Sequence, residues 1–428
     1  MEESSSSELS RDVSVNASTS TSLKDEINIP SENKDDVESD ELYSSFKDFG
    51  VPNVPDDVDY YDDEDDLFDE YGYHDESNCD IDDIVTMFED IDLSTGLEVA
   101  FNDLDAVNQN DEIAVKFKSF KKFDSVSDPS DHHFCSPELL KIKGAGMEPT
   151  KKWTRRIQHE WRLLEKHLPE TIYVRVYEGR LDLLRAAIVG PTGTPYHDGL
   201  FFFDIYFPTF YPSVPPMVHY HSRGLRLNPN LYGCGKVCLS LLNTWNGDKS
   251  ENWRAGSTML QVLVSIQALI LNEKPFFNEP GYETFVNTTE GEWSSLCYNK
   301  TVFVLSCKTM LYSLQSPPKH FESFVAGHFR YRGRAILMAC IAYLQGAQIG
   351  CPVVPKSEAV AREDDGNLST SETKMETRHR RYPTFLRGLC CVFEQLLMEL
   401  TLCGADCQVF HSHKAKKEAA KAASEQEN

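Results

Sequence analysis

Apolar residues recur at helical spacing in residues 151–169, which read KKWTRRIQHEWRLLEKHLP and follow a long polar stretch. A repeat of three to four residues is typical of an amphipathic helix with one face in a core. Basic residues cover the other side, and Pro169 ends the pattern. The side chains that we expect on the buried face are Trp153, Ile157, Trp161 and Leu164.

Four segments of strand character follow this helix. Residues 171–179 alternate in character as a strand does, residues 181–191 and 199–208 are interpreted as two further strands, and turns marked by glycine separate them. Residues 215–221 form a short fourth segment. Strands joined by short turns predict a four-stranded antiparallel meander. The helix packed on one face of that sheet gives an α+β domain.

The helical pattern then returns. Residues 257–273, STMLQVLVSIQALILNE, predict a helix with Ser257 or Thr258 as its N-cap. Further helix candidates follow in residues 282–346, and a last apolar helix spans residues 385–404. In the predicted helix 257–273, the side chains that we expect to be buried are Leu260, Leu263, Val264 and Leu271.

The N-terminal residues 1–130 have a different composition. They are rich in Ser, Asp and Glu and poor in apolar periodicity, so we expect an acidic and mostly disordered region. Residues 80–93, DIDDIVTMFEDIDL, are an exception. This segment either docks in a basic groove or forms a transient, solvated helix. Its apolar residues at helical spacing are Ile81, Ile84, Val85 and Phe88.

The predicted organisation therefore has five parts, and no internal repeat is apparent. The acidic region is followed by a core domain, an additional helical region, a polar linker, and a C-terminal helix with its tail. Their expected bounds are residues 1–130, 150–315, 316–350, 351–380 and 381–428.

Composition and charge narrow the range of functions. The chain has 428 residues and a formal net charge of −26, and residues 56–92 hold 18 acidic residues and no Lys or Arg. This balance argues against nucleic acid as a partner, because phosphate binding needs clustered basic residues. No signal segment and no membrane span is visible, so we expect no membrane contact and a location in the cytosol or nucleus. Cysteines there are expected to be reduced thiols.

Two cysteines lie four residues apart in residues 228–245, NPNLYGCGKVCLSLLNTW. The glycines that flank Cys234 predict a turn with this cysteine at the surface. Cys238 follows among apolar residues, where it is either a core thiol or a nucleophile. A zinc site with His219 and His221 is a further interpretation, although the second cysteine pair typical of structural zinc is missing.

Several motifs of this part of the chain resemble the ubiquitin-conjugating (E2) family, and they occur in the family's order. The motif G-x-x-x-T-P-Y-x-x-G-x-F lies at residues 190–201, Y-P-x-x-P-P at 211–216, and G-x-x-C-L at 235–239. The family's H-P-N is matched at residues 228–230. The resemblance covers Thr154 to Tyr282. It implies the UBC (E2) fold.

The resemblance also implies a chemistry. Cys238 would hold ubiquitin as a thioester, and its thiol would lie open to solvent in a shallow groove. Transthiolation needs a thiol that can both attack and leave. Asn230 matches an asparagine that either stabilises the oxyanion or supports the loop. Glu279, beside Asn278, matches a carboxylate that orients the incoming lysine, and an exposed loop acid is the other interpretation.

The chain departs from the family pattern at three places. Asn228 stands where the family has a histidine, and Ser213 replaces an aromatic residue that contacts RING-type ligases. An insertion between Trp245 and Trp253 replaces a second ligase contact, so the E3 ligase is uncertain. These features resemble the subgroup of large plant E2s and E2/E3 hybrids, which implies substrate selection by the flanks. The residues expected as structural support are Trp245, Tyr196 and Pro229.

The partners implied by the resemblance are ubiquitin, a charged E1 and a protein substrate with an acceptor lysine. The basic face of residues 151–169 resembles the surface that E2 enzymes offer to E1. No metal and no bound cofactor is implied, because the E1 uses ATP upstream. The alternative function is a catalytically silent E2-like module that binds ubiquitin or another partner.

Overall fold

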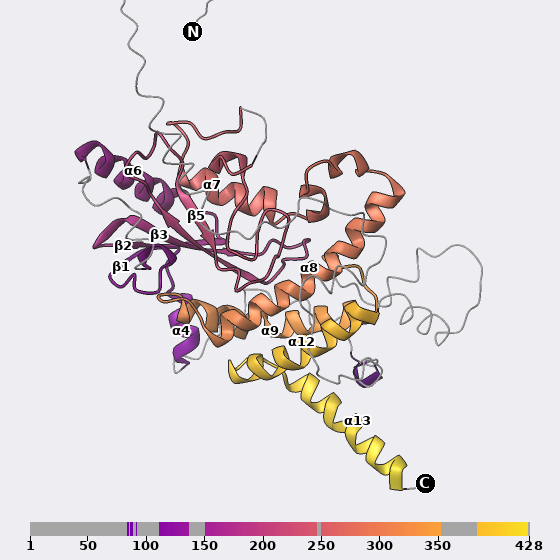
Figure 1. The fold of residues 1–428 in the computed structure, drawn as a ribbon. Helices are drawn as coiled ribbons and strands as arrows, with labels where there is room; N and C mark the ends of the chain where they lie inside the picture. The colour runs from indigo at the N-terminus through magenta and orange to yellow at the C-terminus, as the bar shows by residue number, and fades with distance from the viewer. Residues whose placement is uncertain are drawn as a thin grey trace, which may run out of the picture. The chain divides into compact units, whose positions relative to one another are not determined.

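The structure is a computed structural model that describes residues 84, 86–88, 91, 111–136, 150–245, 250–351 and 383–426. Figure 1 shows a sheet with helices packed against it. The strands are β1 Phe123–Val126, β2 Ile172–Tyr177, β3 Arg180–Val189, β4 Leu200–Tyr206 and β5 Met217–Tyr220. The longer helices are α4 Glu112–Lys118, α6 Lys151–His167, α7 Met259–Ser265, α8 Thr289–Gln315, α9 Glu322–Leu344, α12 Pro383–Leu402 and α13 Gln408–Gln426. The short ones are η3 His133–Cys135, η4 Ser240–Leu242, η5 Ile266–Ile270, η6 Pro275–Asn278 and η7 Tyr282–Phe285.

The sheet contains the predicted meander. Strands β2, β3, β4 and β5 pair antiparallel in chain order, and β1 adds a fifth strand parallel to β2. Strand β4 is apolar at successive positions because both of its faces are buried. Phe201 and Phe203 belong to one core, while Leu200 and Phe202 belong to another on the opposite face.

Helix α6 covers the first core. The side chain of Thr150 caps it by accepting a hydrogen bond from the Trp153 amide at 3.1 Å. Trp153, Ile157 and Leu164 are buried as predicted. Trp161 is only partly buried and packs at the edge of the same core.

Helix α7 lies beside α6 (Figure 1). It begins after Thr258, one of the two predicted caps, which forms a capping box with Gln261. The predicted buried face was right at Leu263 and Leu271 and wrong at two other positions, because Val264 is exposed and Leu260 is only partly buried. The buried stripe has the spacing i, i+3, i+4, i+7 and consists of Met259, Val262, Leu263 and Ile266.

Helices α8 and α9 lie against the opposite face of the sheet, α12 packs on both of them, and the three helices build the second core (Figure 1). They include the helices predicted in residues 282–346 and 385–404. Phe202 of β4 and Phe303 of α8 share this core with Phe324 of α9 and Phe393 of α12. The predicted region 316–350 therefore shares one continuous core with the sheet and the last apolar helix.

Residues 111–126 include α4 and β1, so the predicted disordered region does not extend to residue 130. Phe120 anchors this part of the chain. Its ring centroid lies 5.0 Å from that of Phe324, and the Arg175 guanidinium lies over the Phe120 ring, 4.0 Å from its centroid. Phe120 is a single aromatic residue and belongs to no hydrophobic repeat. The periodicity of the sequence therefore did not predict α4 and β1.

The acidic segment 80–93 contacts the C-terminal helices. The Phe88 ring packs edge-on against Phe393 of α12 at 5.1 Å and against Phe410 of α13 at 6.3 Å between centroids. The described residues of the segment therefore dock on the protein, so the interpretation as a solvated helix was wrong. The surface that receives Phe88 is aromatic, whereas a basic groove was expected. Its buried residues are Ile84, Phe88 and Ile91. The predicted positions that lie outside the described residues are Ile81 and Val85.

Among the residues that the structure describes, no helix combines the length and the apolar character needed to cross a membrane. The predicted linker 351–380 lies outside the described residues except for Cys351.

Candidate active site around Cys238

Cys238 follows a tight turn that comes after β5. The turn is closed by a hydrogen bond of 3.1 Å from the Tyr232 amide to the Lys236 carbonyl. Gly235 has a φ of +87°, and a Cβ atom there would lie 2.1 Å from the ring of His219. Both features require glycine. Cys234 is exposed, as predicted for a residue at the turn.

Two asparagines hold the loop beside Cys238. The buried Asn228 side chain donates to the Tyr196 hydroxyl and to the Ile270 carbonyl, each at 2.7 Å, and accepts from the Asn230 amide. The Asn230 side chain donates to the Cys238 carbonyl at 3.1 Å. The Cys238 amide donates back to the Asn230 carbonyl at 2.9 Å. Asn230 thus contacts the cysteine backbone directly, and Asn228 links this contact to the buried Tyr196.

Pro229 lies between the two asparagines and is also buried. Its fixed φ limits the conformations open to this part of the loop. Pro229 and Tyr196 are thus both buried beside Asn228, and their supporting role stays a prediction.

Thr244 supports the other side of the cysteine and was not recognised in the sequence. Its hydroxyl donates to the Val237 carbonyl at 2.7 Å and accepts from the Leu239 amide at 3.0 Å. The residues on both sides of Cys238 are thus tied to one side chain. A single threonine beyond the cysteine carries no motif, so sequence reasoning had no means of finding it.

The thiol of Cys238 is covered, since only 2% of the residue is exposed. The expectation of a thiol open to solvent is therefore wrong. Burial raises the pKa of the Cys238 thiol above its usual value, while the Lys236 charge and a hydrogen bond from the Tyr232 hydroxyl act to lower it. A reacting carbonyl can reach the sulfur only after neighbouring side chains move.

Glu279 lies close enough to affect the thiol, because its charge acts to raise the pKa of Cys238. Burial raises the pKa of the Glu279 carboxyl itself, and Arg226 opposes this shift from 3.8 Å away. The Arg226 guanidinium also lies 5.1 Å from the centre of the Tyr232 ring. Asn278 holds the loop by donating to the last residue of η5 at 3.3 Å. The structure thus brings the predicted carboxylate and the predicted nucleophile together, with Tyr232 and Arg226 as additional neighbours.

Of the two tryptophans that bound the insertion, Trp253 is the one that packs in the core. The indole of Trp253 is buried, its Nε1 donates to the Pro212 carbonyl at 2.8 Å, and its ring lies 5.5 Å from that of Tyr211. Trp245 is half-buried. The inserted segment therefore ends on the tryptophan that anchors it to the core.

The described part of the chain contains no group of three or more His, Cys, Asp or Glu side chains placed to hold a metal ion. The His219 ring stacks on His133 with centroids 3.4 Å apart, and His221 lies 3.0 Å from the Asp204 carboxylate. The two histidines of the zinc interpretation are thus engaged with other protein groups.

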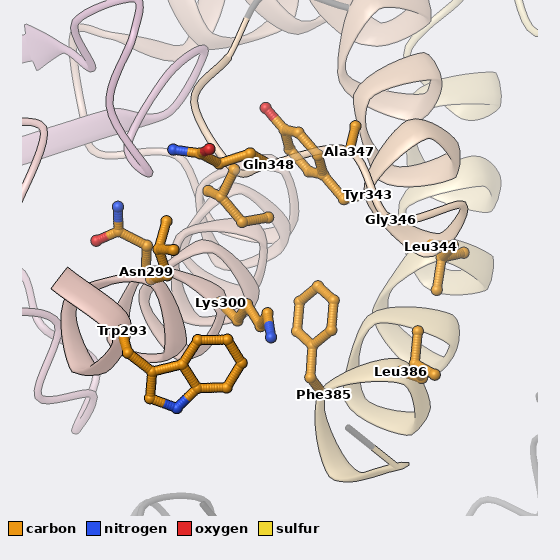
Figure 2. Close-up of a pocket in the computed structure, with 12 residues that line it drawn as sticks. Trp293, Asn299, Lys300, Tyr343, Leu344, Gly346, Ala347, Gln348, Phe385 and Leu386 are labelled. Atoms are coloured by element: carbon orange, nitrogen blue, oxygen red, sulfur yellow. The ribbon is translucent and has the colours of Figure 1, made fainter. Parts of the chain in front are cut away.

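A separate cavity of about 240 Å³ lies between α8, the segment after α9, and the start of α12 (Figure 2). Trp293 and Lys300 of α8 face Phe385 of α12 across it in the figure. The predicted site residues do not line this cavity, so it is distinct from the site around Cys238.

The chain is similar to proteins of one family. The profile of the family described as Ubiquitin-conjugating enzyme matches residues 156–312. An Arabidopsis thaliana protein provisionally named ubiquitin-conjugating enzyme E2 25 is 60% identical over 233 residues, which are 54% of this chain and 37% of that protein. Another from the same plant, provisionally named ubiquitin-conjugating enzyme E2 38, is 58% identical over 238 residues, which are 55% of this chain and 71% of that protein.

A human relative is more distant. The dual E2 ubiquitin-conjugating enzyme/E3 ubiquitin-protein ligase BIRC6 is 38% identical over 251 residues, which are 55% of this chain and 5% of that protein. The match thus spans well under two thirds of the first and the third of these relatives.

Proposed function

Because the chain belongs to the ubiquitin-conjugating enzyme family, we propose that it accepts ubiquitin from a charged E1 as a thioester on Cys238 and transfers it to a lysine of a protein substrate. The observation that carries this proposal is the set of hydrogen bonds that fixes the backbone of Cys238 through Asn228, Asn230 and Thr244. A nucleophile that works by covalent catalysis needs such a defined position.

The loading step begins with the loss of the Cys238 proton. The thiolate attacks the carbonyl carbon of the E1–ubiquitin thioester, a new C–S bond forms, and the E1 thiolate leaves and takes up a proton. Since burial raises the pKa of Cys238, loading includes a rearrangement that uncovers the sulfur. The Tyr232 hydroxyl, which donates to this sulfur, gives way to the C-terminal tail of ubiquitin.

The transfer step reverses the role of Cys238. The substrate amine attacks the thioester carbonyl, the C–N bond forms, the C–S bond breaks, and Cys238 leaves. The side-chain amide of Asn230 has a second N–H, besides the one given to the Cys238 carbonyl, which can donate to the oxyanion. Glu279 accepts the proton of the lysine, and its raised pKa suits a base of this kind.

A thioester assay with E1, ubiquitin and ATP tests the proposal. The wild type forms an adduct that dithiothreitol removes. Cys238→Ala forms none, while the matched variant of the exposed neighbour, Cys234→Ala, loads like the wild type. If only Cys234→Ala loses the adduct, Cys234 is the residue that carries the thioester. If no variant and no wild type loads, while ubiquitin still binds, the chain is the silent module instead.

We further propose that the chain selects substrates through its flanking regions and works in the cytosol or nucleus without a metal or bound cofactor. The similarity to a dual E2/E3 protein supports the first part. Ser213, at the position of the missing aromatic residue, is consistent with a weak requirement for RING-type ligases. Discharge of loaded enzyme onto substrate in the absence of any ligase would test this.

A further inference from the structure

The described residues of the acidic segment 80–93 pack against the C-terminal helices through Phe88. Three aromatic rings meet there, since Phe393 of α12 and Phe410 of α13 contact each other at 6.3 Å as well as contacting Phe88. The Gln345 side chain at the end of α9 donates to the Phe88 carbonyl at 3.2 Å. Gln345, Phe393 and Phe410 define what we call the Phe88 groove.

The ligand in this groove has a recognisable pattern. Ile84, Phe88 and Ile91 are spaced i, i+4, i+7, and each is almost fully buried. This is the spacing with which an amphipathic helix presents anchors to an apolar groove. Thr86 on the same segment is exposed. The buried anchors therefore share one side of the segment.

The charges on the two sides are complementary. Residues 80–93 carry six acidic residues and no basic residue, whereas α13 carries four lysines and two glutamates. Lys414, one turn beyond Phe410 on α13, already pairs with Glu394 of α12 at 2.8 Å. The charge argument therefore rests on the remaining lysines of α13, a helix that Phe88 contacts.

The contact involves few residues among those that the structure describes. It consists of the side chains of Ile84, Met87, Phe88 and Ile91 and the hydrogen bond that the Gln345 side chain donates to the Phe88 carbonyl. Opposed to it is the conformational entropy of ordering a segment whose composition otherwise favours disorder. Gains and costs of similar size give a bound fraction that a competing ligand can shift.

We propose that the Phe88 groove is a docking site for protein partners that present a short acidic helix with Ile or Phe anchors at i, i+4 and i+7, and that residues 80–93 are an internal ligand that competes with them. This proposal does not depend on the thioester chemistry, because it concerns binding alone.

The test measures binding of a fluorescein-labelled peptide with the sequence of residues 80–93 to the full-length chain by anisotropy. Phe88→Ala vacates the groove, so this variant binds the peptide at least about ten-fold more tightly than the wild type, whose own segment competes. Thr86→Ala, an exposed position on the same segment, binds like the wild type. Equal affinity for wild type and Phe88→Ala, or no binding to either, overturns the proposal.

Two altered peptides test the aromatic anchor and the acidic residues separately, with the protein left unchanged. A peptide with Phe88→Ala loses binding if the aromatic anchor enters the groove. A peptide with its acids changed to Asn and Gln binds several-fold more weakly, and the wild-type peptide weakens as salt rises. If neutralising the acids has no effect, the acidic part of the proposal fails.

The protein side is tested with Phe410→Ala in the Phe88→Ala background. This double variant loses the peptide while its circular dichroism spectrum stays native. Light scattering on the wild type measures its oligomeric state and so tests whether a second copy of the chain occupies the groove. If the wild type is a dimer that dissociates in Phe88→Ala, the groove takes the segment of a second copy, and the proposal of an external partner is overturned.

Discussion

At the scale of single residues, the candidate site combines residues that the family pattern predicts with neighbours that no motif emphasises. Cys238, Asn230 and Glu279 were predicted from the family pattern, and the structure brings the three together. Tyr232 was missed because a tyrosine in a turn carries no signal of its own. Its contact with the Cys238 sulfur depends on the fold of the turn around Gly235, which the sequence alone does not show.

The hydrogen bond from Tyr232 to the Cys238 sulfur predicts a measurable change in thiol acidity. Tyr232→Phe removes a hydroxyl that acts to lower the pKa of Cys238, so the pKa of the Cys238 thiol rises further above its usual value. The rate of alkylation of Cys238 by iodoacetamide, followed by mass spectrometry from about pH 6.5 to about pH 10, gives the midpoint. The exposed Cys234 in the same sample is the internal control, and an unchanged midpoint for Cys238 contradicts the assignment.

Asn228 is predicted to be a stability residue of the active-site loop. Asn228→Ala removes the side-chain acceptor of the buried Asn230 amide and the shorter of two hydrogen bonds to the Ile270 carbonyl, which keeps its bond from Asn278. The free energy of unfolding is expected to fall by about 2 kcal/mol. Urea unfolding measures this. Gln158→Ala, at an exposed position of α6, is the control, and its free energy of unfolding is expected to stay close to that of the wild type. An equal loss in both variants would contradict the role assigned to Asn228.

At the scale of elements, prediction succeeded where a repeat was long and one-sided. Helix α6 was found from Trp153, Ile157 and Leu164, and its bounds differ little from the expected ones. The burial of α7 was misassigned at Val264, because a helix with apolar residues on most sides does not reveal which stripe faces the core. The short α4 and β1 lack any repeat and are held by tertiary contacts of Phe120.

The anchoring role of Phe120 can be tested directly. Phe120→Ala removes the ring that Arg175 covers at 4.0 Å, so β1 separates from β2 more readily. Amide hydrogen exchange in residues 120–126 is expected to become faster, while the rest of the sheet keeps its protection. Lys121→Ala, at an exposed neighbouring position, serves as the matched control. Unchanged exchange in Phe120→Ala rules out the anchor.

At the scale of the whole molecule, buried histidines couple stability to pH. Burial lowers the pKa of His219 to about 3 and that of His132 to about 4. In the unfolded chain these side chains titrate near a pKa of about 6.5. Between these values the unfolded state binds more protons, so the free energy of unfolding falls as the pH drops below about 6.5.

Urea midpoints at about pH 7.5, 6 and 5 check this prediction. The midpoint is expected to be highest at the highest of these pH values and to decrease towards the lowest. In His219→Gln the decrease is smaller, because one of the groups that must stay neutral is gone. A flat profile for the wild type over the same range would show that burial of these histidines does not control the acid stability.

Both faces of β4 are buried, and this has a practical consequence for the design of shorter fragments of this protein. The Phe202 ring lies 5.4 Å from that of Phe321, which is outside the 156–312 stretch matched by the family profile. A fragment limited to that stretch would expose the apolar face of β4 that includes Phe202, and we expect it to self-associate. A piece that keeps this contact therefore extends past Phe321, beyond the end of the matched stretch.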